Sequence, residues 1–378
     1  MSSQYPAVDP NGLLEYSVVF TDRSLNHMSK QFQQVMRDIS AGMKLAYNAA
    51  AVAVVPGGGT YGMEAVARQF GGGKKCLVLR NGWFSYRWSQ IFEAGQIPAQ
   101  EIVLKARPIA EGPQQPWTPA PLDEVLASIR QHKPDLVFAP HVETSSGIIL
   151  PDTYLRAVAD AVHAHGGLFV LDCIASGAIW VDMQACAIDV LISAPQKGWS
   201  ASPCSALVML GAQAAERITQ TRSSSFACDL LKWLQIMQAY ENGGHAYHAT
   251  LPTDALARFC QSMQEAQGHG LELLKANQWE LGNRVRALMA ENGFPSVAAA
   301  GFEAPGVVVS YTDELLIHNG KKFIDQGLQI AAGVPMMCDE AADFRTFRIG
   351  LFGMDKWLNL DTTVSNLAQA IQQTRNAG

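Results

Sequence analysis

Two stretches decide the fold of this chain: GGLFVLDCIASGA (residues 166–178) and DVLISAPQKGWSASP (residues 189–203). Each contains a short run that is apolar throughout, which is typical of strands in a parallel sheet covered on both faces. Asp172 ends the first run, and Lys197 follows the second. Because consecutive parallel strands direct their carboxyl ends to one edge of a sheet, we expect the two side chains to meet over the same crevice.

Similar apolar runs alternate with amphipathic stretches through the first two thirds of the chain, which predicts an α/β fold with a mainly parallel sheet. The expected strands are Val52–Val55, Cys76–Leu79, Ile102–Leu104, Leu136–Phe138, Leu168–Leu171, Val190–Ser193 and Ala206–Leu210. The expected helices between them are Met63–Phe70, Ser85–Ala94, Pro121–Gln131 and Tyr154–His165.

The pattern changes near Thr250, where an α+β region is expected to begin. Its elements are a helical stretch from Asp254 to Asn292 broken at Gly268 and Gly270, strands at Gly306–Tyr311, Gly327–Ala331 and Thr346–Leu351, and a terminal helix after Asp361. At 378 residues the chain exceeds the roughly 250–300 at which one core stops growing. We therefore expect an N-terminal arm (1–20), a large domain (21–265) and a small C-terminal domain (266–378).

The composition excludes several classes of partner. A net charge of -6 provides no basic face for nucleic acid or for an anionic membrane. The first residues lack the features of a signal peptide, and no apolar run is long enough to span a membrane. Seven cysteines without a CxxC pair indicate reduced core thiols in a cytoplasmic protein, and neither disulfides nor a metal site.

A glycine-rich turn follows the first expected strand, in VAVVPGGGTYGMEAV (residues 52–66). Gly57, Gly59 and Gly62 match the GxGxxG pattern of dinucleotide-binding proteins. Such a site also needs an acidic residue at the end of the next strand, and here that strand ends in Arg80. The turn is therefore interpreted as a phosphate site at a helix start, with an ordinary tight turn as the alternative.

Asp172 and Lys197 fit the chemistry of pyridoxal 5'-phosphate (PLP). The pyridine nitrogen of PLP must stay protonated to draw electrons from the substrate, and a buried aspartate secures that proton. A lysine forms an imine only when its amine is neutral, and burial together with a nearby pyridinium lowers its pKa. Taken singly, a strand-end aspartate is an ordinary helix cap and a lysine beside glycine a solvated loop residue. Their joint placement behind a phosphate-type loop favours the cofactor site.

Seven motifs in a fixed order carry a resemblance that spans most of the chain. They are LNHMSKQFQQVM (25–36), GGGTYGMEA (57–65), NGWFSYRW (81–88), HVETSSGIILP (141–151), SAPQKGW (193–199), YHATLPT (247–253) and FRIGLFG (347–353). Together they resemble the class V aminotransferases of PLP fold type I, in the serine–pyruvate/alanine–glyoxylate aminotransferase family. The resemblance implies amino transfer from a small L-amino acid to a 2-oxo acid, with glyoxylate or pyruvate favoured as acceptor.

The resemblance also implies residue roles. Lys197 is expected to hold PLP as a Schiff base and to shuttle the substrate Cα proton, while Asp172 contacts the pyridine nitrogen. Arg348 is expected to clamp the substrate carboxylate with a bidentate fork, an ordinary ion pair being the alternative. The remaining cofactor contacts are expected from Gly58, Gly59, Thr60 and Gln196 at the phosphate, Phe84 on the ring face, Thr144 at the ring oxygen, and Tyr247 and Thr250 at the phosphate of the neighbouring subunit. The last pair implies a homodimer with shared active sites.

Three features depart from the family pattern. EYSVVFTDRS (15–24) replaces the usual opening Gly-Pro-Gly-Pro, which leaves the amino donor open, and Phe84 replaces a tryptophan. Tyr61 and Trp83 are bulky neighbours that reshape the pocket. Three other functions are alternatives: a cysteine desulfurase-type PLP lyase with Cys338 as its thiol, an NAD(P)-dependent oxidoreductase, and a non-catalytic PLP-binding module.

Overall fold

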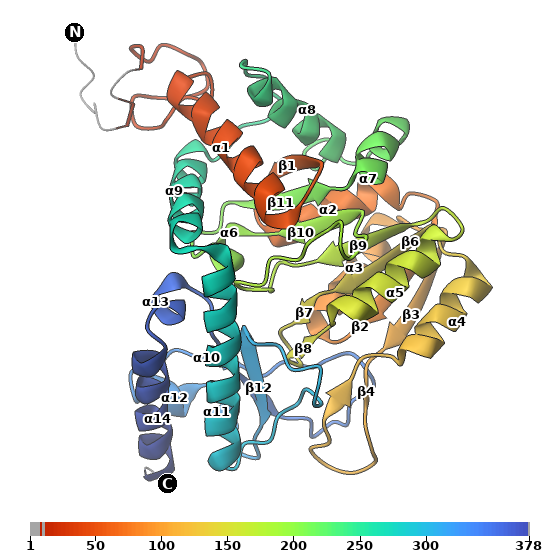
Figure 1. Ribbon diagram of the computed structural model, residues 1–378, viewed down its shortest axis with the longest axis vertical. Helices are drawn as coiled ribbons and strands as arrows, with labels where there is room; N and C mark the ends of the chain where they lie inside the picture. Colours follow the sequence, from red (N-terminus) through yellow and green to blue (C-terminus); the bar gives the residue numbers. More distant parts are fainter. Residues whose placement is uncertain (1–7, 10–11, 377–378) are drawn as a thin grey trace.

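The computed structural model describes residues 8–9 and 12–376, and its centre is a seven-stranded sheet (Figure 1). The strand order is β1-β11-β10-β9-β6-β2-β3. The bounds are β1 Ala51–Pro56, β2 Lys75–Arg80, β3 Gln100–Lys105, β6 Leu136–Pro140, β9 Leu168–Asp172, β10 Val190–Ser193 and β11 Ser205–Leu210. All seven strands predicted from the apolar runs are present.

Strand direction in this sheet is mostly uniform. β9 pairs in parallel with β6 and β10, and β2 pairs in parallel with β3 and β6. Among these seven strands only β11 runs opposite to the other six, and it is antiparallel to both of its neighbours, β1 and β10. The predicted mainly parallel α/β sheet is confirmed. The reversal of β11 was not predicted, because a strand buried on both faces has the same apolar pattern in either direction.

Helices cover both faces of the sheet, which explains why its strands are apolar throughout. In Figure 1, α4 (Leu122–His132) and α5 (Asp152–His163) lie in front of the sheet, and α2 (Gly59–Phe70) and α3 (Trp83–Gly95) lie behind it. Every residue of β6, β9, β10 and β11 is buried between these layers. The four predicted helices are confirmed, although α2, α3 and α5 begin earlier than expected.

Helix α1 (Lys30–Tyr47) packs against α8 (Leu230–Glu241) and α9 (Thr253–His269). The Ser29 hydroxyl caps it by accepting the Phe32 N–H at 3.1 Å. Its buried side chains recur every three or four residues and form one apolar face: Phe32, Met36, Ile39, Met43 and Tyr47.

Short elements occupy the connections around the sheet. They are β4 Arg107–Pro108, β5 Trp117–Thr118, β7 Val142–Glu143, β8 Ile148–Ile149, α6 Pro195–Gly198, α7 Ala212–Arg217 and the 3₁₀ helix Ile218–Gln220. The proline-containing segment between β4 and β5 lies at the surface.

The C-terminal region is built on a three-stranded antiparallel sheet in the order β12-β14-β13. Its elements are α10 Leu271–Glu291, β12 Val307–Tyr311, α11 Leu315–His318, α12 Lys321–Ile324, β13 Ala331–Ala332, β14 Thr346–Gly350, α13 Met354–Trp357 and α14 Leu360–Asn376. The chain turns between α9 and α10 at Gly270, whose φ of 93° suits glycine, whereas Gly268 lies inside α9.

One predicted strand, Gly327–Ala331, is wrong. Gly327 lies in the turn after α12 with a φ of 80°, and only Ala331–Ala332 pairs with β14. Apolar residues in a stretch this short do not distinguish a strand from a turn that packs against the core.

The predicted domain division remains a prediction. Its boundary at residues 265 and 266 falls inside α9, and α10 runs from the large sheet toward the small one (Figure 1). Residues 1–7 and 10–11 of the predicted arm, and residues 377–378 of the small domain, lie outside the described part of the chain.

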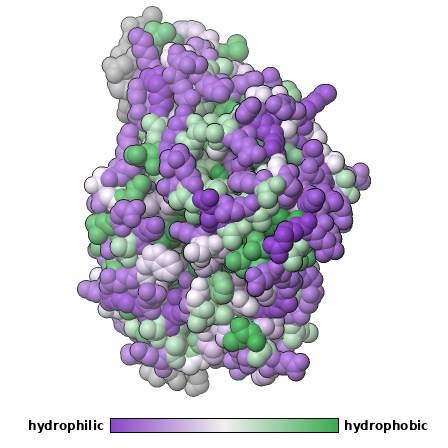
Figure 2. Space-filling view, turned by 45° about the vertical axis from the view of Figure 1, so that its right-hand side comes forward, coloured by the Kyte–Doolittle hydropathy of each residue, from purple (hydrophilic) through white to green (hydrophobic). Residues whose placement is uncertain are grey.

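The surface and the cysteines agree with the composition. All seven cysteines are buried free thiols, as predicted for core residues. On the face shown in Figure 2, apolar residues form separate patches among hydrophilic ones. Among the described residues, none of the helices combines the length and the apolar character needed to cross a membrane.

Candidate active site

Asp172 and Lys197 lie at the same edge of the large sheet. Asp172 is the last residue of β9, and Lys197 lies in α6, the short helix that follows β10. β9 and β10 are adjacent and parallel, with Ile192 in register with Asp172. The predicted juxtaposition therefore follows from strand adjacency, because both carboxyl ends open on one crevice.

Asp172 is 6% exposed, and its Oδ1 accepts the Ile174 N–H at 2.9 Å. Burial raises the pKa of Asp172 to about 7, against the lowering effect of that hydrogen bond, and the nearby Glu143 raises it further. Arg87 and Lys197 lower the same pKa. A cation close to this carboxyl group would therefore keep it ionised at neutral pH.

The Lys197 side chain is half-buried, and its amine has no hydrogen bond or ion pair within the described residues. Its Nζ lies 4.8 Å from the centroid of the Phe352 ring. Burial lowers the pKa of Lys197, and the positive charge of Arg348 lowers it further, while Asp172 opposes both. These surroundings favour the neutral amine that imine formation needs.

The glycine-rich turn leads from β1 into α2 beside this edge. Gly57 has a φ of 118°, which few other residues adopt, and α2 begins at Gly59. A side chain at Gly59 would collide with Ile174, since its Cβ would lie 2.5 Å from Ile174 Cδ1. No atom lies within 4 Å of the corresponding position at Gly58. The turn thus leaves open space next to the first N–H groups of α2.

Phe84 lies in the first turn of α3, and Glu143 holds that turn in place. The Glu143 carboxylate is completely buried and accepts the Phe84 N–H at 3.2 Å and the Ser85 N–H at 2.8 Å. The hydroxyls of Ser85 and Ser145 donate to it at 2.7 and 2.8 Å. The sequence does not indicate this role of Glu143, because only the fold shows that it caps a helix from a distant segment.

Thr144 follows Glu143 and is 8% exposed, and its hydroxyl has no hydrogen bond to the described residues. Gln196 precedes Lys197, and its Oε1 is buried without a hydrogen-bond partner in the described part of the chain. Unpaired buried amide oxygens are rare, so this position is consistent with a ligand contact by the Gln196 side chain.

Arg348 projects from β14 toward Phe84, with its Cζ 5.6 Å from the ring centroid. Its Nε–H donates to the Ala332 carbonyl oxygen at 2.8 Å, which orients the guanidinium. Burial lowers the pKa of Arg348, and Glu143 opposes this effect. No carboxylate of the described residues lies within ion-pair distance of Arg348, so the alternative of an ordinary ion pair is not observed.

Tyr247 and Thr250 lie together but contact none of the other predicted site residues. Their hydroxyl oxygens are 3.1 Å apart, and both residues are exposed, Tyr247 by 54%. The structure therefore brings together Asp172, Lys197, Phe84 and Arg348, and leaves this pair elsewhere on the surface.

The sequence also missed Arg87, which lies one helical turn after Phe84 in α3. Its Nη1–H donates to the Thr60 hydroxyl oxygen at 3.0 Å, and its Cζ is 5.2 Å from the Phe84 ring centroid. The signal available in the sequence was a basic residue three positions after the expected ring-stacking aromatic, on the same helix face.

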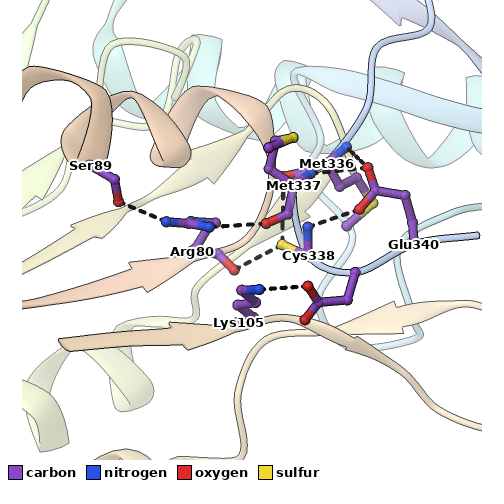
Figure 3. A network of polar contacts seen from close by, with 8 residues as sticks. Arg80, Ser89, Lys105, Met336, Met337, Cys338 and Glu340 are labelled. Carbon is purple, nitrogen blue, oxygen red and sulfur yellow. Dashed lines mark hydrogen bonds and ion pairs between the residues drawn. The ribbon is translucent and has the colours of Figure 1, made fainter. Parts of the chain in front are cut away.

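A cavity of about 690 Å³ opens away from these residues, between β3, the β4–β5 connection and the loop that precedes β14. Neither Lys197, Asp172 nor Arg348 lines it. Figure 3 shows how that loop is fastened to the large sheet: Arg80 donates to the Met337 carbonyl oxygen at 3.2 Å, and Lys105 pairs with Asp339 at 2.6 Å. The cavity therefore lies beside a structural junction.

Cys338 lies in the same loop and does not resemble a mobile catalytic thiol. It is 4% exposed, and its thiol donates to the Arg80 carbonyl oxygen at 3.4 Å (Figure 3). Burial raises the pKa of Cys338 to about 12, with Glu143 and Glu340 adding to the effect. Since the thiolate is the nucleophile, this position does not support the desulfurase alternative.

The residues at the sheet edge fit PLP. Open space at Gly58 suits a phosphate, the unpaired Gln196 Oε1 belongs to the residue before the lysine, and Asp172 is a buried carboxyl group that a cationic partner would keep ionised. The guanidinium groups of Arg87 and Arg348 both lie near the Phe84 ring. The fold and this set of groups define a PLP-dependent enzyme of fold type I.

Comparison with known proteins gives the family. The family model Aminotransferase class-V matches residues 13–337. The small subunit of a soluble hydrogenase from Synechococcus sp. (strain PCC 6716) is 26% identical over 333 residues, which are 87% of this chain and 83% of that protein. An alanine–glyoxylate aminotransferase of Felis catus is 29% identical over 273 residues, 70% of this chain and 61% of that protein. The crystal structure of an alanine–glyoxylate aminotransferase from Nostoc sp. matches with a TM-score of 0.78 at 19% identity, and the match covers 92% of this chain and 88% of that one.

The chain belongs to the class V aminotransferase family. It is a PLP-dependent aminotransferase, as the seven motifs predicted.

Proposed function

We propose that the protein transfers the amino group of a small L-amino acid to a 2-oxo acid, with glyoxylate or pyruvate as the favoured acceptor. The observation that carries this proposal is Arg348: a guanidinium without a carboxylate partner among the described residues, beside Phe84 and close enough to Lys197 to lower its pKa. Donor and acceptor share an α-carboxylate next to the reacting carbon, and one guanidinium serves both. The names of the Felis catus and Nostoc relatives support glyoxylate as acceptor.

Bound PLP would supply a protonated ring that accepts electrons from the substrate. Lys197 would hold the cofactor covalently and, once released by the amino donor, take the proton from the substrate Cα and return it. Phe84 would stack on the ring and Thr144 would hydrogen-bond on the ring-oxygen side. Gly58, Gly59, Thr60 and Gln196 would bind the phosphate.

The proposal is tested with a panel of amino donors added singly to the PLP-loaded protein. A true donor converts the cofactor to its pyridoxamine form, which is followed by absorbance, and glyoxylate or pyruvate then reverses the change. The proposed substrates would be contradicted if no small L-amino acid produced the spectral change, or if neither oxo acid reversed it.

The Asp172 carboxyl group leads to a prediction about pH. In the unfolded chain an aspartate ionises near pH 4, whereas in the folded, cofactor-free protein burial raises the pKa of Asp172 to about 7. A raised pKa contributes stability that is fully present below the unfolded value and is lost as pH rises through about 7. Between about pH 5.5 and pH 8.5 the free energy of unfolding of the cofactor-free wild type should therefore fall by an amount on the order of a few kcal/mol. D172N should not show this loss.

Urea unfolding of both cofactor-free proteins at the two pH values measures this difference. The same pH dependence in wild type and D172N would show that the Asp172 carboxyl group is not the cause. In the PLP-loaded enzyme, D172N should slow removal of the substrate Cα proton at least about tenfold, since a charge-assisted contact contributes about 1.5–3 kcal/mol.

We further propose a homodimer in which Tyr247 and Thr250 bind the phosphate at the partner's Lys197. Both residues are exposed, and they contact no other predicted site residue within one chain. Apolar side chains are also exposed in the segment that follows residue 12, including Leu13, Tyr16 and Val18. Such side chains are commonly covered in a subunit interface. The cytoplasmic location and the domain division at residue 265 remain predictions alongside this assembly.

Hybrid dimers test the sharing of active sites. K197A forms no imine, and Y247F/T250V should bind PLP more weakly. If the pair acts across the interface, a hybrid of the two variants has one intact site, and half of its sites should regain wild-type PLP affinity. If the pair acts within its own subunit, no hybrid site is intact and none should regain it. Thr219→Val, at an exposed threonine bonded to Glu216, is the control and should leave PLP affinity unchanged.

A further inference from the structure

Arg87 is a half-buried cation that forms no ion pair within the described residues, although it is close enough to Asp172 to lower the pKa of that carboxyl group. It lies in α3, and no carboxylate of the described residues is within ion-pair distance of its guanidinium. Its contacts are the Thr60 hydroxyl at 3.0 Å and the face of Phe84 at 5.2 Å. By contrast, Arg68 in the neighbouring α2 pairs with Glu64 at 2.7 Å. Because partly buried charges are normally paired, Arg87 points to an anion that completes its surroundings.

The position of Arg87 identifies where that anion lies. Thr60 is in the first turn of α2, directly after the open space at Gly58. Arg87 and Arg348 both lie over the Phe84 ring, but Arg348 is fixed by the Ala332 carbonyl oxygen and Arg87 by Thr60. The two guanidinium groups are thus directed to different ends of one site, Arg87 to the glycine-rich turn.

The hydrogen bond between Arg87 and Thr60 also sets the direction of the Thr60 hydroxyl proton. A guanidinium has only donors, so the Thr60 oxygen must accept in this contact. The single proton of that hydroxyl is then free to be donated elsewhere. A donor oriented in this way, next to the N–H groups of a helix start, suits a phosphate oxygen.

We propose that Arg87 is a positioning residue for the phosphate group of PLP: it orients the Thr60 hydroxyl as a donor and offsets the charge of the phosphate dianion. This inference rests on the proposed placement of the phosphate at Gly58–Thr60. Neither the sequence motif nor Lys197 and Asp172 account for this role of Arg87.

The test compares two aldehydes that differ only in the phosphate. Cofactor-free wild type, R87Q, R87K and T60V are titrated with PLP and with pyridoxal, and imine absorbance reports binding. R87Q should weaken the binding of PLP about ten- to a hundredfold, which is the range for a lost contact to a charged group. It should leave the affinity for pyridoxal unchanged. R87K keeps the charge but not the planar fork, so its affinity for PLP should lie between those of wild type and R87Q. R37Q, at a half-buried arginine of α1 bonded to Gln34, is the matched control and should bind both aldehydes normally.

Two further measurements separate this role from a structural one. The loss of PLP binding free energy in the double variant T60V/R87Q should be smaller than the sum of the losses in the two single variants, because both substitutions remove the same oriented donor. The ³¹P resonance of bound PLP should stay that of the dianion as pH is lowered through about 6 in wild type, and should titrate in R87Q.

The inference would be overturned if R87Q weakened the binding of PLP and of pyridoxal equally, or if R87Q bound PLP as tightly as wild type. It would also be overturned if the losses of PLP binding free energy in T60V and R87Q were strictly additive in the double variant. A wild type that forms no borohydride-sensitive imine with either aldehyde would overturn the proposed function, and this inference with it. Circular dichroism and thermal unfolding check that each variant is folded. T60V allows PLP and pyridoxal binding to be compared without a change in charge.

Discussion

Replacing Lys197 with alanine is expected to abolish multiple turnover, with a loss of at least about four orders of magnitude in rate. In the described structure Lys197 is the lysine at the sheet edge beside Asp172, with a half-buried amine and a lowered pKa. No neighbouring side chain there supplies both an imine and a proton acceptor for the substrate Cα. The measurement is steady-state transamination together with the absorbance of the covalent PLP linkage, which should disappear.

PLP affinity in K197A distinguishes the lysine's chemistry from the integrity of the site. The phosphate contacts do not depend on the amine, so noncovalent binding should persist. K74A, at an exposed lysine near Asp135, is the matched control and should keep both the linkage and the turnover. Wild-type turnover in K197A would show that the cofactor linkage lies on another residue.

Replacing Arg348 with alanine should leave the spectrum of bound PLP unchanged and weaken the use of both amino acid and oxo acid. We expect a loss of about 2–4 kcal/mol in kcat/KM for each half-reaction, because a bidentate carboxylate contact is removed from a partly buried site. The kcat/KM of R348K should lie between those of R348A and wild type, since a lysine keeps the charge but cannot form the fork. Single-turnover kinetics with alanine and with glyoxylate measure the two losses separately.

An amine that lacks a carboxylate is the decisive comparison for Arg348. Its reactivity should be indifferent to R348A, because it offers nothing for the guanidinium to bind. R345A is the control, since Arg345 donates to the Asp313 carbonyl oxygen and lines the separate cavity. If R348A slows the carboxylate-free amine as much as alanine, Arg348 supports the structure and the carboxylate is bound elsewhere.

Residue order alone was enough to predict the large sheet and the placement of Asp172 and Lys197 at one edge of it. Both predictions depend on local patterns: apolar runs of strand length, and a polar residue at the carboxyl end of each of two consecutive runs. Where pairing is less regular the prediction was wrong, as at Gly327–Ala331, or incomplete, as for the direction of β11.

The parts of the site that the sequence did not predict are contacts between distant segments. Glu143 caps α3 from a connection that lies fifty-eight or more positions further along the chain, as its bonds to Phe84 and Ser85 show. Arg87 reaches Thr60 across the gap between α3 and α2. Neither contact has a local pattern, because each requires two elements to be packed before their side chains can meet.

The sequence by itself determined which residues form the strands of the large sheet, that Asp172 and Lys197 share one edge, and that a glycine-rich turn opens beside them. These features follow from hydrophobic periodicity and strand adjacency, which act over neighbouring residues. Only the tertiary structure decided that Arg348 arrives without a carboxylate partner, that burial raises the pKa of Asp172 to about 7, and that the thiol of Cys338 is sealed in a loop junction. The physical reason is that desolvation and charge pairing depend on which groups surround a side chain in space, and those groups come from every part of the chain.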